Sequence, residues 1–366
     1  MSFGVAVVGC GNISDQYLTN LTAFPDLEVL ICADLDEARA RAQAEKYGVP
    51  ASGGVGQALA HPGVRLVVNL TVPSAHYDVA SAALAAGKHV WNEKPLTLDP
   101  DSGRTLLKEA AQAGVRLGCA PDTFLGAGLQ TARRLIDEGA IGVPQTALAL
   151  MQSPGPESWH PSPEFLFQRG AGPLYDMGPY YLTTLASLFG PAERVVATGR
   201  RSRETRVIGS GPKAGTEFPV EVPTHVAALI DYAAGQSASV ILSYESPLSR
   251  HGFVEITGTE ATLALPDPNR FDGSLRLRTA GSDDWTVIGS AGATAGRGMG
   301  VLDMARSIAA GVPHRASGEM ALHVLETMAA VEVSAAEGTF QPIAGQFTIP
   351  EALPSSWDPG DSSLII

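Results

Sequence analysis

The stretch VAVVGCGNIS, residues 5–14, decides the fold of the first part of this chain. The apolar run of residues 5–8 predicts a buried strand, and the glycines after it predict a tight turn into a helix. Gly9 permits the turn, and Gly11 lets the backbone approach a bound group closely. The N–H groups at the start of the helix then face an anion such as a pyrophosphate. Ser14 takes the place of the third glycine of the usual dinucleotide-binding pattern.

Asp34 supports the same interpretation from the next predicted strand, LICAD at residues 30–34. A carboxylate about twenty residues after the glycines binds the ribose hydroxyls of adenosine and repels a 2′-phosphate, which favours NAD over NADP. The alternative is that the glycines only shape a turn and that Asp34 caps a helix. Asp36 is the rival carboxylate, and we interpret it as the cap. The residues expected to bind the dinucleotide here are Gly9, Gly11, Asn12, Ile13 and Asp34.

Short β-rich runs alternate with amphipathic helical stretches as far as about residue 119, an order that builds a parallel sheet covered by helices. The expected strands are residues 5–8, 29–33, 66–70, 89–91 and 116–119, and the expected helices are residues 13–21, 36–47, 74–86 and 100–113. This pattern predicts a doubly wound Rossmann domain over residues 1–121.

After a helix expected at residues 127–138, many short strands predict a largely antiparallel open sheet with helices on one face. The expected strands are residues 145–152, 194–201, 222–231, 237–244, 252–257, 262–265, 275–278 and 285–288, followed by helices at 299–310 and 318–337. The predicted fold class is therefore α/β plus α+β. We expect a substrate-binding and oligomerisation domain over residues 122–345 and a C-terminal tail over residues 346–366. The end of the tail, DPGDSSLII at residues 358–366, is expected to be polar and loosely held except for its last three residues.

Composition narrows the possible classes of protein. The 366 residues are 45% hydrophobic and 17% charged, which is typical of a globular chain of about two domains. The net charge of −13 argues against non-specific binding to nucleic acid or to an anionic membrane. The start of the chain lacks a secretory-signal pattern, and Cys10, Cys32 and Cys119 suit reduced thiols better than disulfides or a metal site. We therefore expect a cytoplasmic protein without a metal centre.

A charged pair ends the fourth predicted strand, in GKHVWNEKP at residues 87–95. Glu93 and Lys94 lie at the carboxyl edge of the sheet, where ligands of such folds bind, and Pro95 stiffens the loop. The loop after the third strand, NLTVPSAH at residues 69–76, reaches the same edge. Lys94 is thus placed to hydrogen-bond a substrate hydroxyl beside the carbon that gives up a hydride.

With these residues the chain resembles the glucose–fructose oxidoreductase, inositol dehydrogenase and rhizopine catabolism family, the Gfo/Idh/MocA oxidoreductases. The resemblance covers essentially the whole chain, and the EKP element is its most specific mark. It implies that Lys94 is catalytic and touches the cofactor, and that Glu93 orients it or contacts the nicotinamide ribose. It also implies that Thr71, Pro73 and His76 line the cofactor cleft. For His76, local hydrogen bonds at the start of a helix are the alternative.

The segment GAGPLYDMGPYY, residues 170–181, resembles a second family element: a glycine cluster, an aspartate and, four residues later, usually a histidine. Asp176 matches the aspartate and is implied to orient the hydroxyl or the lysine. Tyr180 replaces the histidine, as in some members of the family. A nearby ammonium stabilises a phenolate, so we expect Tyr180, assisted by Lys94, to take the proton of a substrate alcohol. Either residue remains a candidate for the base, and helix capping by Asp176 or simple burial of Tyr180 are the alternatives.

The sequence thus predicts an NAD-dependent oxidoreductase that acts on a sugar, cyclitol or related polyol. Trp159 and His160, in a proline-rich loop, are expected to contact the sugar, although Trp159 also suits a purely structural role in that loop. An NAD-dependent glycoside hydrolase of the same family and a non-enzymatic dinucleotide-binding regulator are the alternatives. We expect a homodimer or homotetramer that pairs through the exposed face of the second sheet.

Overall fold

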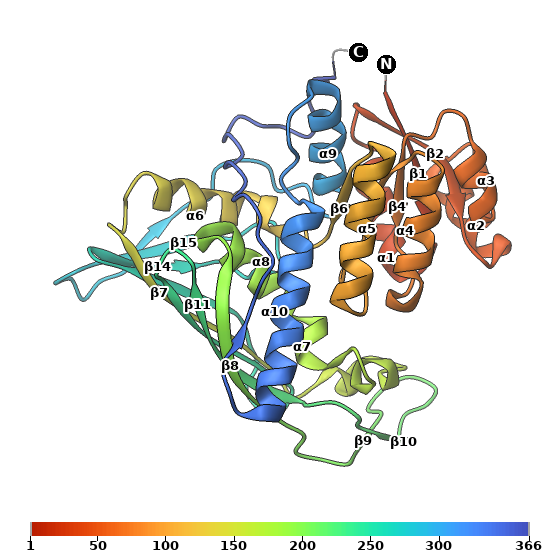
Figure 1. The fold of residues 1–366 in the computed structure, drawn as a ribbon. Helices are drawn as coiled ribbons and strands as arrows, with labels where there is room; N and C mark the ends of the chain where they lie inside the picture. Colours follow the sequence, from red (N-terminus) through yellow and green to blue (C-terminus); the bar gives the residue numbers. More distant parts are fainter. Residues whose placement is uncertain (1, 365–366) are drawn as a thin grey trace. The chain divides into compact units, whose positions relative to one another are not determined.

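The computed structural model describes residues 2–364, which form a six-stranded, a nine-stranded and a two-stranded sheet (Figure 1). Contacts divide the chain into two compact units, which we describe separately. The first unit runs to Gln130 and also includes Ala291–Leu325 and the chain from Pro350 onward. The second unit comprises Thr131–Ser290 and Glu326–Ile349.

The first unit is built on the six-stranded sheet, whose order is β3-β2-β1-β4-β5-β6 and whose pairs are all parallel. Its strands are β1 (Phe3–Val8), β2 (Leu27–Ala33), β3 (Ala51–Gly53), β4 (Leu66–Asn69), β5 (His89–Asn92) and β6 (Leu117–Cys119). Its helices include α1 (Asn12–Leu21), α2 (Glu37–Tyr47), α3 (Val55–Ala60), α4 (His76–Ala85) and α5 (Pro100–Ala113). All six residues of β1 are buried, because both faces of the sheet are covered. The predicted Rossmann fold is confirmed.

Two short elements of this unit are absent from the sequence prediction. β3 has three residues and ends in a glycine, and α3 has six residues, one of them Gly56. Elements this short show little hydrophobic periodicity, so the sequence pattern does not reveal them. The predicted cap Asp36 is confirmed, because its carboxylate accepts from the N–H groups of Ala38 and Arg39. Asp99 caps α5 in the same way and accepts from the N–H of Ser102.

The second unit contains the nine-stranded sheet, in the order β16-β15-β14-β13-β7-β12-β11-β8-β17. Its pairs are antiparallel apart from β12 with β7, which are parallel, so the sheet is mixed but largely antiparallel, as expected. The strands are β7 (Pro144–Gln152), β8 (Ala192–Arg200), β11 (His225–Tyr232), β12 (Ser237–Ser243), β13 (Arg250–Gly258), β14 (Ala261–Leu265), β15 (Leu275–Thr279), β16 (Thr286–Ile288) and β17 (Gln341–Pro342). A separate hairpin pairs β9 (Thr205–Val207) with β10 (Glu217–Pro219).

Helices cover one face of this sheet (Figure 1). They are α7 (Gly172–Asp176), α8 (Gly178–Phe189) and the carboxyl-terminal half of α10 (Gly318–Glu337), while α6 (Ala127–Asp137) leads into the unit. Leu174, Leu182 and Val331, one from each covering helix, meet Val226 of β11 and Leu242 of β12 around a small cavity. The core of the second unit therefore lies between these helices and the alternate residues of β11 and β12 that face them.

The segment Ala291–Leu325, with helix α9 (Met299–Ala310), groups with the first unit, whereas the sequence suggested one boundary near residue 121. Asp122 explains the grouping, because its Oδ2 accepts the N–H groups of Gly298 at 2.8 Å and of Gly300 at 3.0 Å. Gly300 also lies against the ring of Trp91 so closely that any side chain there would overlap it. The first turn of α9 thus docks on the edge of the parallel sheet through contacts that are distant in sequence.

The tail is held more firmly than the sequence suggested. Arg306 of α9 donates to the carbonyl oxygens of Asp358 and Asp361, at 2.9 and 2.6 Å. The buried Asp26 accepts from the backbone N–H groups of Ser363 and Leu364. The expectation of a loose tail is therefore wrong for Asp358, Asp361 and Ser363, whereas the anchoring of Leu364 agrees with the exception made for the last three residues. Of its last three residues, 365 and 366 lie outside the described part of the chain.

Between residues 2 and 364, no helix combines the length and the apolar composition needed to cross a membrane.

Candidate active site

The glycine turn is tightly packed at Gly9 and open at Gly11. Gly9 has φ +95°, and a Cβ on it would lie 2.6 Å from the carbonyl carbon of Leu70, so only glycine fits there. Gly11 precedes α1, and a Cβ there would meet no atom within 4 Å. The space above the first turn of α1 is therefore open to a ligand. The backbone N–H groups of that turn, which includes Asn12 and Ile13, suit a pyrophosphate.

Asp34 is tied into this turn through both of its carboxylate oxygens. Its Oδ2 accepts the N–H of Cys10 at 2.7 Å, and its Oδ1 accepts the N–H of Asp36 at 2.9 Å. The side chain is 11% exposed, and Arg39 approaches it at 3.9 Å. Each carboxylate oxygen keeps a second acceptor position, so Asp34 has the capacity to bind ribose hydroxyls while it shapes the turn.

Glu93 fixes the start of the lysine loop. Its backbone N–H donates to the carbonyl of Asn69 on the neighbouring strand β4, at 2.9 Å. Its Oε2 accepts the backbone N–H of Lys94 at 2.8 Å, and its Oε1 accepts the hydroxyl of Tyr17 at 2.8 Å. Lys94 comes two residues after the end of β5, at the carboxyl edge of the parallel sheet where β1 runs into the glycine turn. The structure thus brings the predicted lysine and the predicted phosphate-binding turn to one edge of one sheet.

His76 lies behind this edge and joins its two loops. Its Nδ1 is 2.6 Å from the carbonyl oxygen of Pro95, and its Nε2 is 3.1 Å from that of Thr71. The side chain is fully buried, and burial lowers the pKa of the imidazole. Thr71 and Pro73 are more exposed than His76. Backbone hydrogen bonds therefore occupy the ring of His76, in agreement with its local interpretation, and they hold Thr71 and Pro95 in place.

In the second unit, Asp176 and Tyr180 lie on two successive helices. Asp176 is the last residue of α7, Met177 interrupts the helix, and Tyr180 lies in the first turn of α8. Asp176 and Tyr180 therefore do not share one continuous helix, since Gly178 and Pro179 start a new helix. Tyr180 is buried, with 5% of its surface exposed.

Tyr244 belongs to the same cluster and was missed by the sequence interpretation. Its hydroxyl donates to Oδ2 of Asp176 at 2.7 Å. Burial and the charge of Asp176 raise the pKa of Tyr244 well above its ordinary value, so the phenol stays protonated and keeps donating. Its position as the last residue of the strand expected at residues 237–244 was the available sequence signal, because polar groups at strand ends often serve a site.

A buried arginine organises the loop that carries Trp159 and His160. Arg206 forms ion pairs with Glu157 and with Glu245, the latter at 2.7 Å, and donates to the carbonyl of Tyr244 at 2.9 Å. This arrangement fixes the start of the loop next to the strand end that holds Asp176. Trp159 is 67% exposed, and its ring lies 5.5 Å from that of His160 in an edge-to-face arrangement. The loop thus presents an aromatic surface on a rigid base.

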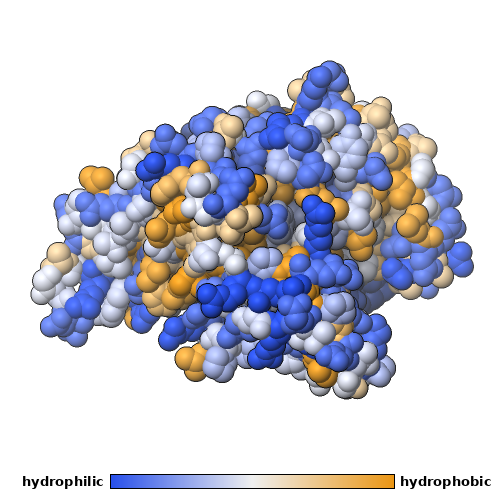
Figure 2. Space-filling model, turned by 60° about the horizontal axis from the view of Figure 1, so that its bottom comes forward, coloured by the Kyte–Doolittle hydropathy of each residue, from blue (hydrophilic) through white to orange (hydrophobic). Residues whose placement is uncertain are grey.

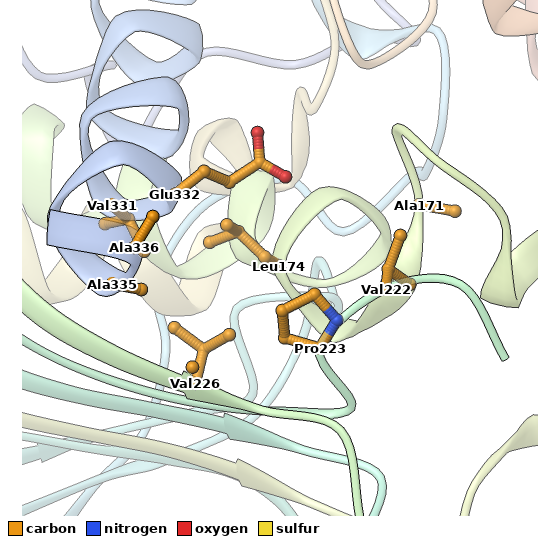
Figure 3. A pocket seen from close by; sticks show the side chains of 10 residues that line it. Ala171, Leu174, Val222, Pro223, Val226, Val331, Glu332, Ala335 and Ala336 are labelled. Carbon is orange, nitrogen blue, oxygen red and sulfur yellow. The ribbon is translucent and has the colours of Figure 1, made fainter. Parts of the chain in front are cut away.

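A pocket of about 350 Å³ opens elsewhere in the second unit, between α7, α10 and strands β8 and β11 (Figure 3). Its lining is mostly apolar, and Glu332 provides its one ionisable side chain among the described residues. Oε2 of Glu332 already accepts the hydroxyl of Tyr175 at 2.7 Å. Trp159, His160, Asp176 and Tyr180 do not line this pocket. A hydroxyl-rich substrate needs several convergent polar groups, so this pocket does not suit it.

The predicted site residues therefore fall into two groups, one in each unit. The glycine turn, Asp34 and Lys94 lie in the first unit, and Asp176, Tyr180 and the Trp159 loop lie in the second. Across residues 2–364, no cluster of three or more His, Cys, Asp or Glu side chains is arranged to hold a metal ion.

Comparisons with known proteins match both units. A family model described as an oxidoreductase family with an NAD-binding Rossmann fold matches residues 3–120, and a GFO/IDH/MocA C-terminal domain model matches residues 129–264. Trans-1,2-dihydrobenzene-1,2-diol dehydrogenase of Sus scrofa is 27% identical over 274 residues, 73% of this chain and 75% of that protein. D-xylose 1-dehydrogenase (NADP(+)) 2 of Haloferax volcanii is 25% identical over 341 residues, 92% of this chain and 98% of that protein.

Solved structures add a match of fold. Levoglucosan dehydrogenase in complex with NADH and levoglucosan superposes with a TM-score of 0.82 at 20% identity, covering 94% of this chain and 100% of that one. At this level of identity the similarity shows the fold alone.

Proposed function

Because this chain belongs to the Gfo/Idh/MocA family of oxidoreductases, with an NAD-binding Rossmann domain, we propose that it is an NAD-dependent dehydrogenase of a sugar, cyclitol or related polyol. The observation that carries the proposal is the common edge of the parallel sheet, where Lys94 follows β5 and the open glycine turn follows β1. The named relatives act on diols and sugars, which supports this substrate class.

NAD is the proposed cofactor, although one of these relatives is named for NADP. Gly9, Gly11 and the N–H groups of Asn12 and Ile13 hold the pyrophosphate in this proposal, and Asp34 accepts the ribose hydroxyls. Thr71 and Pro73 line the cleft on the other side, with His76 behind them. A 2′-phosphate would bring a second negative charge next to Asp34, which disfavours NADP.

The chemistry that a bound nicotinamide supplies is acceptance of a hydride from the substrate carbon. The protein removes the hydroxyl proton. We assign that proton transfer to Tyr180 and Lys94, with Asp176 orienting the hydroxyl or the lysine. The hydrogen bond from Tyr244 supports this role for Asp176, because it fixes one carboxylate oxygen and so limits rotation of the carboxylate. Trp159 and His160 offer an aromatic face and a ring nitrogen to a sugar.

The proposed assembly is a homodimer or homotetramer in the cytoplasm. Cys10, Cys32 and Cys119 are buried free thiols, which suits a reducing compartment. On the face of the nine-stranded sheet opposite the helices, Leu229 of β11 is 54% exposed and Leu148 of β7 is 39% exposed. Ser239 of the intervening strand β12 pairs with both residues, so the two leucines lie in one row across the sheet. Figure 2 shows hydrophobic patches among hydrophilic residues on one side of the molecule. Such apolar surface favours pairing with a second copy.

To test this proposal, NADH formation is monitored by absorbance with each compound of a panel of sugars, inositols and glycosides, and the products are analysed. Substrate-dependent NADH formation is expected for a polyol or sugar. Glycoside cleavage without net NADH would instead indicate the NAD-dependent hydrolase. Tight dinucleotide binding with no turnover of any compound would indicate a regulator.

A further inference from the structure

Tyr17 is a buried hydroxyl that the mechanism above does not use. It lies in α1, the helix that follows the glycine turn, and its side chain has no exposed surface. Its hydroxyl donates to Oε1 of Glu93 at 2.8 Å. The indole Nε1 of Trp91 in turn donates to the Tyr17 oxygen at 3.3 Å. A buried hydrogen-bond network of Trp91, Tyr17 and Glu93 therefore connects α1 to the end of β5.

The chemistry of the groups determines which of them donates in each hydrogen bond of this network. An indole N–H only donates, so the phenol oxygen of Tyr17 is the acceptor for Trp91, and its proton is available to Glu93. Burial, together with the charges of Glu93 and Asp122, raises the pKa of Tyr17 well above its ordinary value, so the phenol stays protonated. Tyr17 is thus a permanent donor to Oε1 of Glu93.

The other carboxylate oxygen of Glu93 reaches the lysine. Oε2 accepts the backbone N–H of Lys94 at 2.8 Å, and Glu93 is itself only 7% exposed. A carboxylate held at both oxygens has one orientation, whereas one held at a single oxygen rotates more freely. The position of the Lys94 backbone therefore depends on the donor at Oε1.

We propose that Tyr17 is a positioning residue that holds Glu93, and through it Lys94, in fixed register with the dinucleotide-binding helix. This inference rests on the proposed role of Lys94 in proton transfer. α1 is the element that the pyrophosphate would contact, and the Tyr17 hydroxyl links it to the lysine loop by one hydrogen bond. Reaction geometry tolerates little displacement, so the loss of this link affects turnover more than cofactor binding.

The first test measures the Lys94 backbone without cofactor or substrate. The chain has five lysines, Lys46, Lys88, Lys94, Lys108 and Lys213, so ¹⁵N-lysine labelling gives five backbone amide signals. The signal that is missing from the spectrum of the Lys94→Arg variant belongs to Lys94. In Tyr17→Phe, the hydrogen-exchange rate of the Lys94 amide should rise about tenfold, because a tenfold change in rate corresponds to the free energy of one hydrogen bond to a charged group. The other four amides should exchange at unchanged rates.

Tyr47→Phe is the matched control. The Tyr47 hydroxyl also bonds to α1, but at its outer side, where it meets Oδ1 of Asp15 at 2.9 Å. This variant loses a tyrosine hydroxyl against the same helix and should leave exchange of the Lys94 amide unchanged. If Tyr17→Phe leaves the Lys94 amide as protected as in the parent protein, or if Tyr47→Phe exposes it equally, the positioning role is excluded.

A double-mutant cycle separates positioning from simple packing. Tyr17→Phe and Glu93→Gln should each lower kcat, with the dissociation constant of NADH little changed, and the double variant should lose no more than the more damaging single change. Additive losses would contradict the inference. If Tyr17→Phe does not fold, Trp91→Phe tests the same hydrogen-bond network, because it removes the indole donor that holds the Tyr17 hydroxyl. Exchange of the Lys94 amide should then be faster than in the parent protein, by a smaller factor than in Tyr17→Phe. Unchanged exchange in that variant would also overturn the inference.

The proposed function fails on different results. Full turnover by Lys94→Ala would remove Lys94 from the mechanism, whatever the exchange rates are. An unaffected Lys94 amide in Tyr17→Phe would remove only the positioning role of Tyr17.

Discussion

Lys94 is the residue on which the proposed chemistry depends most directly. It lies two residues after the end of β5, and the side chain of Glu93 accepts its backbone N–H. We expect Lys94→Ala to lower kcat by roughly 10²- to 10⁴-fold, the usual contribution of a group that moves a proton. NADH affinity, measured by fluorescence titration, should change little, because the glycine turn and Asp34 remain. Turnover within a few-fold of the parent protein would contradict the assignment.

Asp34 governs the choice between NAD and NADP in this proposal. Leu35 beside it is 98% exposed, so an arginine at that position has room to reach a 2′-phosphate. We expect Asp34→Ser combined with Leu35→Arg to shift the ratio of kcat/KM values toward NADP, because a repulsive carboxylate is replaced and a cation is added. Leu35→Arg alone is the control and should shift the ratio less. An unchanged ratio in the double variant would remove Asp34 from the ribose site.

At the scale of elements, the structure depends on contacts that particular helices make with the sheets. Helix α9 docks on the parallel sheet at Gly300, against the ring of Trp91. We expect Gly300→Ala to destabilise the protein by about 1–3 kcal/mol, the usual cost of overpacking a core. The lower Tm would be measured by thermal unfolding.

Gly56 provides the matched control for that substitution. It is the second residue of α3, is exposed, and would gain a Cβ that meets no atom within 4 Å. Gly56→Ala should therefore stabilise the protein by about 0.5–1 kcal/mol, since alanine favours the helix over glycine. Opposite signs for the two Gly→Ala changes are expected. A Gly300→Ala variant as stable as the parent would show that α9 is not packed on Trp91 as described.

At the scale of the whole molecule, the proposed self-association uses the open face of the nine-stranded sheet. Among the large apolar residues described on β7, β11 and β12, Leu229 is the most exposed. We expect Leu229→Arg to lower the oligomeric mass measured by light scattering, because a charge would be buried in the interface. Val312→Arg, a substitution on an exposed loop residue after α9, should leave the mass unchanged. An unaffected oligomer in Leu229→Arg would place the interface elsewhere.

Much of the molecule could be predicted from local patterns. The run VAVV before GCG, the cap Asp36 and the alternation of short strands with helices indicate a Rossmann domain, because turn chemistry and hydrophobic periodicity act over a few residues. The family resemblance added roles for Lys94 and Asp176. These features depend on neighbours in the sequence, so they can be recognised in one sequence without coordinates.

Other features were decided only by the tertiary structure. The bonds of Tyr17 to Glu93, Tyr244 to Asp176 and Asp122 to the start of α9 join residues 68 to 178 positions apart. The break at Met177 and the anchoring of the tail on Asp26 also became visible only in the folded chain. A buried polar group must find a partner wherever the fold brings one within about 3 Å, and sequence periodicity carries no record of which distant residue that is.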